Sequence, residues 1–208
     1  MPLFARLSRH LPATLLVLYS IFFIALGITP FRREVWYAEN IPIVAIVLAL
    51  TFLYWRGIRF SNTAYLLMSV LVFMHTIGGH YTFERVPFDL FQTFFGFERN
   101  MYDRVAHFSV GLYAFAFTEF LFRSRSVSNR SALFFFPLFA IAFVAMGYEI
   151  IEWLFVVASD PAAGTAFLGS QGDVWDAQKD MLSDTLGALF ALGLFFFVRR
   201  PEFSKSSV

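Results

Sequence analysis

The sequence predicts an all-α protein, a polytopic transmembrane helix bundle with about six spans. Of its 208 residues, 58% are hydrophobic and only 15% are charged, whereas a soluble domain has about 45–50% and about 25%. Thirty phenylalanines are too many to bury in a soluble core of this size, and on a water-exposed surface they would cause aggregation. Long runs without Asp, Glu, Lys or Arg also recur along the chain. A lipid bilayer is therefore the expected environment.

Composition also excludes several classes of protein. Lys and Arg number 16 against 15 Asp and Glu, so there is no basic excess, and nucleic acid is not an expected partner. The chain has no Cys, which excludes disulfides and thiolate chemistry. Low charge and the lack of polar tracts argue against a disordered chain.

The first three spans follow from the charge-free runs, because a spanning helix needs about 20 mostly apolar residues. The first run lies between Arg9 and Arg32, the second ends at Arg56, and the third begins after Arg59. A Gly-Gly pair at 78–79 is expected to end the third helix. The predicted helices are 11–29, 38–55 and 61–79.

The last three spans contain ionisable residues near one end. The fourth run continues through Glu119, the fifth continues through Glu149, and the sixth needs residues before Asp184 to reach full length. The predicted helices are 102–122, 131–157 and 177–198. No internal repeat or linker is visible, so residues 1–208 are interpreted as one integral membrane domain.

The distribution of basic residues predicts the orientation. Six spans place both termini on the same side, where ten Lys and Arg flank the spans against six on the other side. Short basic loops stay in the cytoplasm, so both termini are predicted to be cytoplasmic, in the inner membrane of a bacterium. Arg6 and Arg9 before an apolar run resemble a signal peptide, but the run is long and Ala25-Leu26-Gly27 is a poor cleavage site. Cleavage there would leave five spans.

Ionisable residues of four spans are predicted to meet in the outer third of the membrane, on a helix rise of 1.5 Å per residue. Asp103 and His107 are spaced i,i+4, and Glu149 and Glu152 are spaced i,i+3, so each pair shares a helix face. The sixth helix carries one acidic stripe that continues into Gly187 and Ala191, small residues that allow close helix approach. The stripe consists of Asp173, Asp176, Asp180 and Asp184.

Burying several carboxylates together requires compensation, because a charged side chain at the bilayer centre costs about 2.5–3.5 kcal/mol. Bound protons, basic partners such as Arg104, or a divalent metal ion would each provide it. The predicted catalytic residues are His107, Glu149, Glu152 and Asp184. The candidate metal ligands are His75, Asp103, His107, Glu149, Glu152, Asp180 and Asp184. The alternative is that these groups only form hydrogen bonds that hold the helices together.

A Phe-rich segment precedes the fourth span. Pro87 lies at a plausible helix start, and Phe88, Phe91 and Phe95 share one face. Such a helix would lie in the outer membrane interface, as an aromatic anchor or as a gate for lipids.

Three motifs resemble the YjdF inner-membrane family, a bacterial group of unknown function. They are Tyr102-Asp103-Arg104-Val105-Ala106-His107-Phe108, the turn from Tyr148 to Trp153, and the segment from Gly172 to Asp184. The resemblance covers nearly the whole chain and implies an integral inner-membrane protein, without bringing a reaction or a cofactor. The order Asp-x-x-x-His-Phe, Glu, Asp…Gly more remotely resembles VanZ-like membrane proteins, associated with glycopeptide resistance. Those usually carry Asp-Lys-x-x-His, and an Asn where Ser183 or Asp184 falls here.

Three functions remain open from the sequence. The first is an enzyme acting on a lipid or lipid-linked phosphate, with a metal or a carboxylate activating water. The second is a cation- or proton-coupled transporter or flippase. The cytoplasmic half of the spans offers only Glu119 as a relay group, which argues against a continuous proton path. The third is a non-catalytic structural or accessory protein. The sequence does not assign the substrate, the metal or the oligomeric state.

Overall fold

The computed structural model describes residues 3–127, 129–158, 164, 167–168 and 170–199. In this part of the chain the regular secondary structure is helical, without strands. Six of its helices are long and apolar enough to cross a membrane, which confirms the predicted all-α, six-span fold class. They cover His10–Gly27, Arg33–Trp55, Asn62–Tyr81, Tyr102–Arg123, Arg130–Ala158 and Asp176–Val198.

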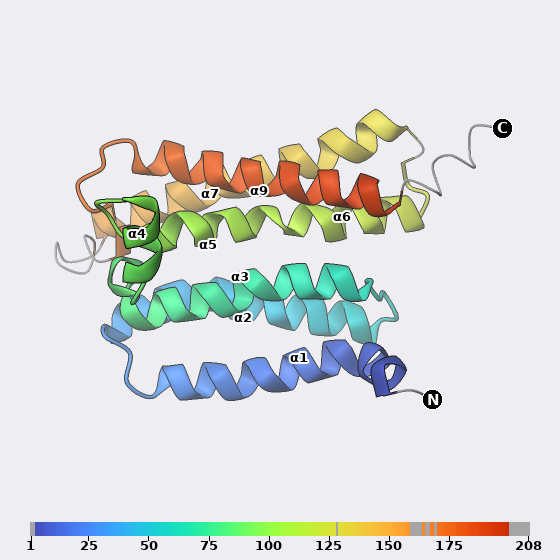
Figure 1. Ribbon diagram of the computed structural model, residues 1–208, viewed down its shortest axis with the longest axis horizontal. Coiled ribbons are helices and arrows are strands. Elements are labelled where there is room, and N and C mark those ends of the chain that lie inside the picture. The colour runs from blue at the N-terminus through green and yellow to red at the C-terminus, as the bar shows by residue number, and fades with distance from the viewer. Residues whose placement is uncertain (1–2, 128, 159–163, 165–166, 169, 200–208) are drawn as a thin grey trace.

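The helices run alongside one another and form two groups (Figure 1). One group contains α1 (Leu3–Gly27), α2 (Arg33–Trp55) and α3 (Asn62–Tyr81). The other contains α5 (Tyr102–Gly111), α6 (Tyr113–Arg123), α7 (Arg130–Ala158) and α9 (Asp176–Val198). Helix α3 joins the groups, because it packs against α1 and α2 as well as α5 and α6, while α9 packs against α5, α6 and α7.

Two short helices mark one end of the bundle. These are η1 (Phe83–Arg85) and α4 (Asp89–Phe95), and we call this end the α4 end. Helix α1 begins and α9 ends at the opposite end, which we call the terminal end (Figure 1). As expected from the sequence, Phe88, Phe91 and Phe95 lie together: the Phe91 ring of α4 stacks on Phe88, just before the helix, and lies tilted against Phe95. Leu90 and Phe94 are exposed.

The Gly78-Gly79 pair does not end α3, which continues to Tyr81. A Cβ atom at position 78 would overlap the ring of Phe83, and one at position 79 would overlap the side chain of Asn40. The glycines therefore allow η1 and α2 to pack closely against α3, and they do not act as a C-cap. At its other end, α3 begins after Ser61, whose hydroxyl accepts a hydrogen bond from the Ala64 N–H.

The predicted fourth helix is broken at Leu112 into α5 and α6, although both parts belong to one span. The N–H of Leu112 bonds the carbonyl of Ser109, three residues back, in place of the regular fourth. The break follows Gly111, whose added Cβ would overlap the backbone of α9, while a Cβ at Gly187 would overlap the carbonyl of Phe108. The predicted close approach at Gly187 is therefore confirmed.

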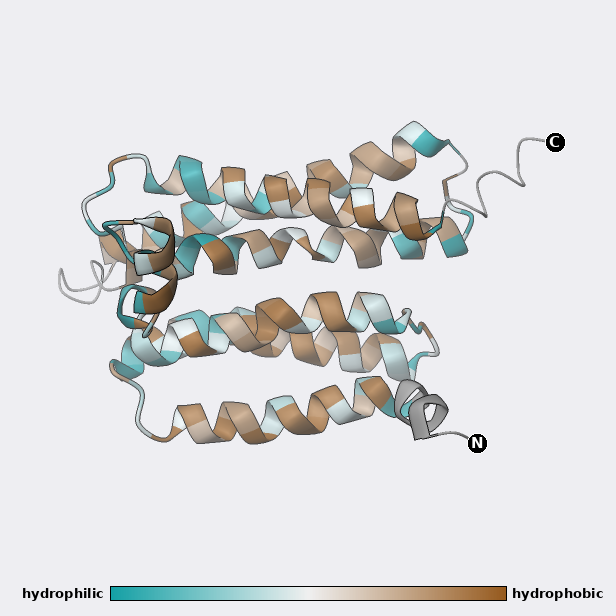
Figure 2. Cartoon of the chain, in the orientation of Figure 1, coloured by the Kyte–Doolittle hydropathy of each residue, from teal (hydrophilic) through white to brown (hydrophobic). Residues whose placement is uncertain are grey.

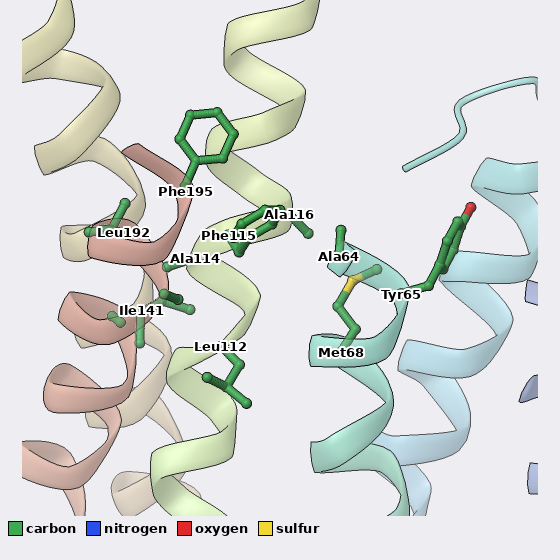
Figure 3. Packing of buried hydrophobic residues seen from close by; sticks show 12 residues of the cluster. Ala64, Tyr65, Met68, Leu112, Ala114, Phe115, Ala116, Ile141, Leu192 and Phe195 are labelled. Carbon is green, nitrogen blue, oxygen red and sulfur yellow. The ribbon is translucent and has the colours of Figure 1, made fainter. Parts of the chain in front are cut away.

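An apolar core fills the middle of the bundle (Figure 3). Met68 from α3, Phe115 from α6 and Phe195 from α9 are all buried in it. The Phe115 and Phe195 rings make an edge-to-face contact, with their centroids 5.3 Å apart. Hydrophobic colour predominates along the middle of the helices, and hydrophilic colour gathers toward their ends (Figure 2). Large apolar side chains such as Ile24 and Phe143 are exposed, as expected where the solvent is lipid.

Glu119 ties three helices together at the terminal end. Its carboxylate is fully buried and accepts hydrogen bonds from the Ser61 N–H and hydroxyl, at 3.0 and 2.6 Å. Arg123 lies 2.7 Å from the same carboxylate and Arg199 lies 3.8 Å away. We call Glu119, Ser61, Arg123 and Arg199 the Glu119 cluster, and it joins the start of α3 to the ends of α6 and α9.

Candidate functional site

A ladder of ion pairs joins α5 to α9 at the α4 end. The Arg104 guanidinium pairs with Asp180 and lies 2.5 Å from Asp176. Arg99 lies 2.8 Å from Asp176 and 3.2 Å from Asp173. The spacing of Asp176 and Asp180 on α9 directs both toward α5, as the sequence stripe predicts. The start of α9 is thereby held against α5 by charge-assisted hydrogen bonds.

Asp173 lies just before α9, outside the spans. The Lys179 ammonium, 2.7 Å from its Oδ2, and the Trp175 N–H, 3.1 Å from its Oδ1, lower the pKa of Asp173 to about 2. The carboxylate is therefore ionised at every physiological pH, and it serves the ladder as a permanent charge.

His107 is surrounded by three carboxylates one turn further along α5. Its Nδ1 lies 3.2 Å from Oδ2 of Asp184. Its Nε2 lies 3.7 Å from Oδ1 of Asp103 and 3.8 Å from Oδ1 of Asp180. All four residues are buried. The structure thus brings together Asp103, His107, Asp180 and Asp184, as expected from their depth and spacing.

Asp103, His107 and Asp180 form a group that could hold a metal ion. One ligand atom from each lies within 4.8 Å of the others, and an imidazole with two carboxylates is a common ligand set for divalent ions. A second observation points the same way. Oδ1 of Asp184 and Oε1 of Glu149 are buried and have no hydrogen-bond partner in the described residues, and an unmatched buried acceptor is costly. A bound proton or a nearby cation would reduce this cost.

A second imidazole–carboxylate pair lies beside the first. His75 of α3 has its Nε2 2.9 Å from Oε2 of Glu39, which is only 1% exposed. The Tyr148 hydroxyl donates to the same oxygen at 2.9 Å. The Tyr148 ring also contacts both imidazoles edge to face, with ring centroids 6.0 Å from His75 and 6.3 Å from His107. His75 therefore faces Glu39 and Tyr148, and it is not part of the Asp103–His107–Asp180 group.

Sequence reasoning missed Glu39 and Tyr148. The predicted second span begins at residue 38, which puts Glu39 at its boundary, but α2 begins at Arg33, which places Glu39 in its second turn. The Arg32-Arg33-Glu34 sequence was the available signal, because it moves the polar boundary of the span several residues upstream. Tyr148 could have been noted as the residue before Glu149, but nothing in the sequence indicates its contact with Glu39.

The two pairs line one cavity of about 140 Å³ between α2, α3, α5 and α7. Its polar lining consists of Glu39, His75, Asp103, His107, Tyr148, Glu152 and Asp184. Glu152 is buried, whereas Glu149 is half-buried and lies outside the lining. Four carboxylates and two imidazoles thus face a single cavity, and the nearby Arg104 is engaged by the ladder.

The remaining histidines are elsewhere. His80 places its Nδ1 2.7 Å from the carbonyl of Leu26 and its ring edge-on to Trp36. His10 is exposed on α1. Neither contributes to the cavity.

Sequence comparison with known proteins identifies the family of this chain. The sequence profile of a family described as predicted membrane protein (DUF2238) matches residues 11–201. The chain belongs to this family. It is also 34% identical over 189 residues to the Inner membrane protein YjdF of Escherichia coli (strain K12), an alignment covering 88% of this chain and 84% of the relative. No solved structure matches.

The family and the six apolar helices together support a multi-pass protein of the bacterial inner membrane. The predicted resemblance to the YjdF family is confirmed. The family description gives no reaction, so the activity has to be argued from the site.

Proposed function

We propose that this family member is a metal-dependent membrane enzyme acting on a lipid or lipid-linked phosphate. The α4 end would face the periplasm, and the site would bind one divalent ion through Asp103, His107 and Asp180. The observation that carries the proposal is the arrangement of His107, with Nδ1 3.2 Å from Asp184 and Nε2 directed toward two carboxylates.

The two nitrogens of His107 would then have different roles. Nδ1–H donates to Asp184, which fixes the tautomer and leaves the lone pair of Nε2 available for a metal. A carboxylate that orients a ligating histidine in this way is a recurrent feature of metal sites. Arg104 counts as a competing cation for Asp180, so metal binding would require Arg104 to rest mainly on Asp176.

The charge balance explains why a phosphate would need the metal. Glu39, Asp103, Glu152 and Asp184 all face the cavity, and they would repel a phosphate in a low-dielectric site. A divalent cation held by Asp103, His107 and Asp180 would offset part of this repulsion and would lower the pKa of a water molecule. Glu152 would accept a proton as the water oxygen forms a new bond to phosphorus. As the bond from phosphorus to the leaving oxygen breaks, His75 or Tyr148 would donate a proton to that oxygen.

Metal content of the purified protein tests the first step. We expect about one divalent ion per chain by inductively coupled plasma mass spectrometry after dialysis, and its loss in His107→Ala and Asp103→Asn. Asp89→Asn, an exposed carboxylate on α4, is the matched control and should retain the metal. Metal-free wild-type protein that also fails to bind added Zn²⁺, Mn²⁺ or Mg²⁺ would refute the proposal.

Phosphate release tests the second step. Wild-type protein in mixed micelles with an extract of inner-membrane lipids should release inorganic phosphate, or a phosphorylated headgroup, when the metal is present. Chelation and His107→Ala should each abolish the release. A metal-loaded protein that releases neither product would show that the metal serves another purpose.

A structural role is the second candidate, because Arg99, Arg104 and Lys179 already pair with Asp173, Asp176 and Asp180. In that case Asp103→Asn would lower the unfolding temperature without changing metal content or phosphate release. A proton-coupled transporter has less support, because the buried Glu119 is held within the Glu119 cluster.

A further inference from the structure

The cavity is layered along the bundle axis. Four helices each present a polar side chain to it, and each presents an apolar side chain about one turn closer to the terminal end. The polar residues are Glu39, His75, His107 and Tyr148, and the apolar residues on the same helices are Ile43, Leu71, Val110 and Val144. A spacing of three or four residues keeps each pair on one helix face. One end of the cavity therefore suits a polar group, and the other suits a hydrocarbon chain.

The apolar part of the cavity reaches the lipid-facing surface between α2 and α7. Val144 lines the cavity and is 53% exposed. Helices α2 and α7 are not among the pairs that pack extensively in the described residues. Val144 is 14 residues from both Arg130 and Ala158, so about 21 Å of helix separates it from either end of α7. The opening thus lies at hydrocarbon depth.

The Glu39–Tyr148 hydrogen bond closes the space above this opening. It joins α2 to α7 at 2.9 Å, one turn closer to the α4 end than Val144. The cavity is also smaller than the ~300–1,000 Å³ that encloses a whole drug-sized ligand. It can therefore hold only part of a molecule, and the rest would extend through the opening into the bilayer.

We propose that this cavity binds a membrane lipid that enters sideways between α2 and α7. Its hydrocarbon chain would pass Ile46 and Val144, and its polar head would lie against His75, Tyr148 and His107. Binding of the lipid through its hydrocarbon chain stands independently of the metal, but the lipid's role as a phosphate substrate rests on the proposed function. The inference adds the route of entry and restricts substrates to molecules with a long hydrocarbon chain.

Retained lipid tests the proposal. Wild-type protein is washed extensively in detergent and examined by native mass spectrometry, with lipid extraction to identify the bound species. We expect about one lipid per chain, reduced at least tenfold in Val144→Trp, which fills the opening. Phe143→Trp is the matched control, because Phe143 is 70% exposed and does not line the cavity. This control should retain the lipid.

Ile46→Trp is a second blocking variant, and it keeps the test valid if Val144→Trp does not fold. Ile46 lines the cavity, so a Trp there would narrow the opening from the α2 side. Loss of lipid in both blocking variants, with wild-type unfolding temperatures, supports the proposal. Equal lipid retention in Val144→Trp and Phe143→Trp, or no lipid in the wild-type protein, would overturn it.

Metal content separates this proposal from the proposed function. Asp180→Asn should lose the metal and keep the lipid, because Asp180 belongs to the metal group but does not line the cavity. Val144→Trp should lose the lipid and keep the metal. Wild-type protein that binds metal but no lipid would overturn the lipid inference alone. Protein that binds lipid but no metal would overturn the proposed function alone.

Discussion

At the scale of single residues, Asp184 is the side chain whose role is most sharply testable. It is 1% exposed and lies 3.2 Å from Nδ1 of His107, but it is not in the group that would surround the metal. We expect Asp184→Asn to weaken metal binding about 10–100-fold, the usual effect of removing the partner of a ligating histidine. Isothermal titration with Zn²⁺ measures the change.

Asp184→Asn must be distinguished from a general loss of fold. The variant should keep a single cooperative unfolding transition, and Asp184→Glu should restore part of the affinity because it keeps a carboxylate. Unchanged metal affinity in Asp184→Asn would mean that His107 does not rely on Asp184 for its orientation.

Asp173 gives a prediction about pH. Its pKa is lowered to about 2, with the Lys179 hydrogen bond as the main cause, so its contribution to folding is fully present above the ordinary Asp pKa of about 4. The contribution is lost as the pH falls through about 2. The groups that face it are Lys179, Arg99, Arg104 and Asp176.

The measurement compares the unfolding temperatures of wild-type protein and Asp173→Asn. The wild-type protein should unfold at the higher temperature at pH 6, and the difference should shrink between about pH 4 and pH 2. A difference that stays constant over this range would show that the Asp173 charge does not stabilise the fold.

Residues that share a helix face were predictable, whereas contacts between distant helices were not. Asp103 and His107 follow from i,i+4 spacing, and Asp180 and Asp184 follow from the stripe on α9. The contact of Glu39 with Tyr148 depends on how α2 and α7 are rotated, which periodicity on a single helix does not determine. Both residues were therefore missed, although they complete the second imidazole–carboxylate pair.

At the scale of elements, the α5–α9 crossing depends on Gly187. A Cβ atom there would overlap the carbonyl oxygen of Phe108, so we expect Gly187→Ala to lower the free energy of unfolding by about 1–3 kcal/mol. Metal binding should weaken as well, because His107 and Asp184 meet across the same contact. Chemical denaturation in mixed micelles measures the first effect.

Gly193→Ala on the same helix is the matched control. A Cβ atom at Gly193 would meet no atom within 4 Å, so this variant should be neutral or more stable by up to about 1 kcal/mol, the helix-propensity gain. Equal destabilisation by both substitutions would assign the effect to the helix backbone and not to the crossing.

The break at Leu112 shows the limit of prediction at this scale. Hydropathy predicts one continuous span over 102–122, and the span is present. The break lies where α9 approaches Gly111. The sequence does not indicate that Gly111 and Gly187, on separate helices, come into contact. The same holds for Gly78-Gly79, which serves packing where the sequence suggested a helix end.

At the scale of the whole molecule, the six spans were predictable because lipid imposes length and composition on each helix. The orientation and the single domain remain predictions. We expect green fluorescent protein fused after Val208 to fluoresce, because it folds in the cytoplasm. Alkaline phosphatase fused after Gly96 should be active, because it requires the periplasm. The reverse pattern would place the candidate site on the cytoplasmic side.

Different helices are joined by different polar contacts at the two ends of the molecule. At the terminal end, one buried carboxylate joins α3, α6 and α9 through the Glu119 cluster. At the α4 end, the Tyr148 hydroxyl joins α7 to α2 by one hydrogen bond among the described residues. Neither α2 nor α7 contributes to the Glu119 cluster, so breaking this bond would let these two helices separate while α3, α6 and α9 stay joined. A hydrocarbon chain would then enter or leave the bundle without loss of its overall architecture.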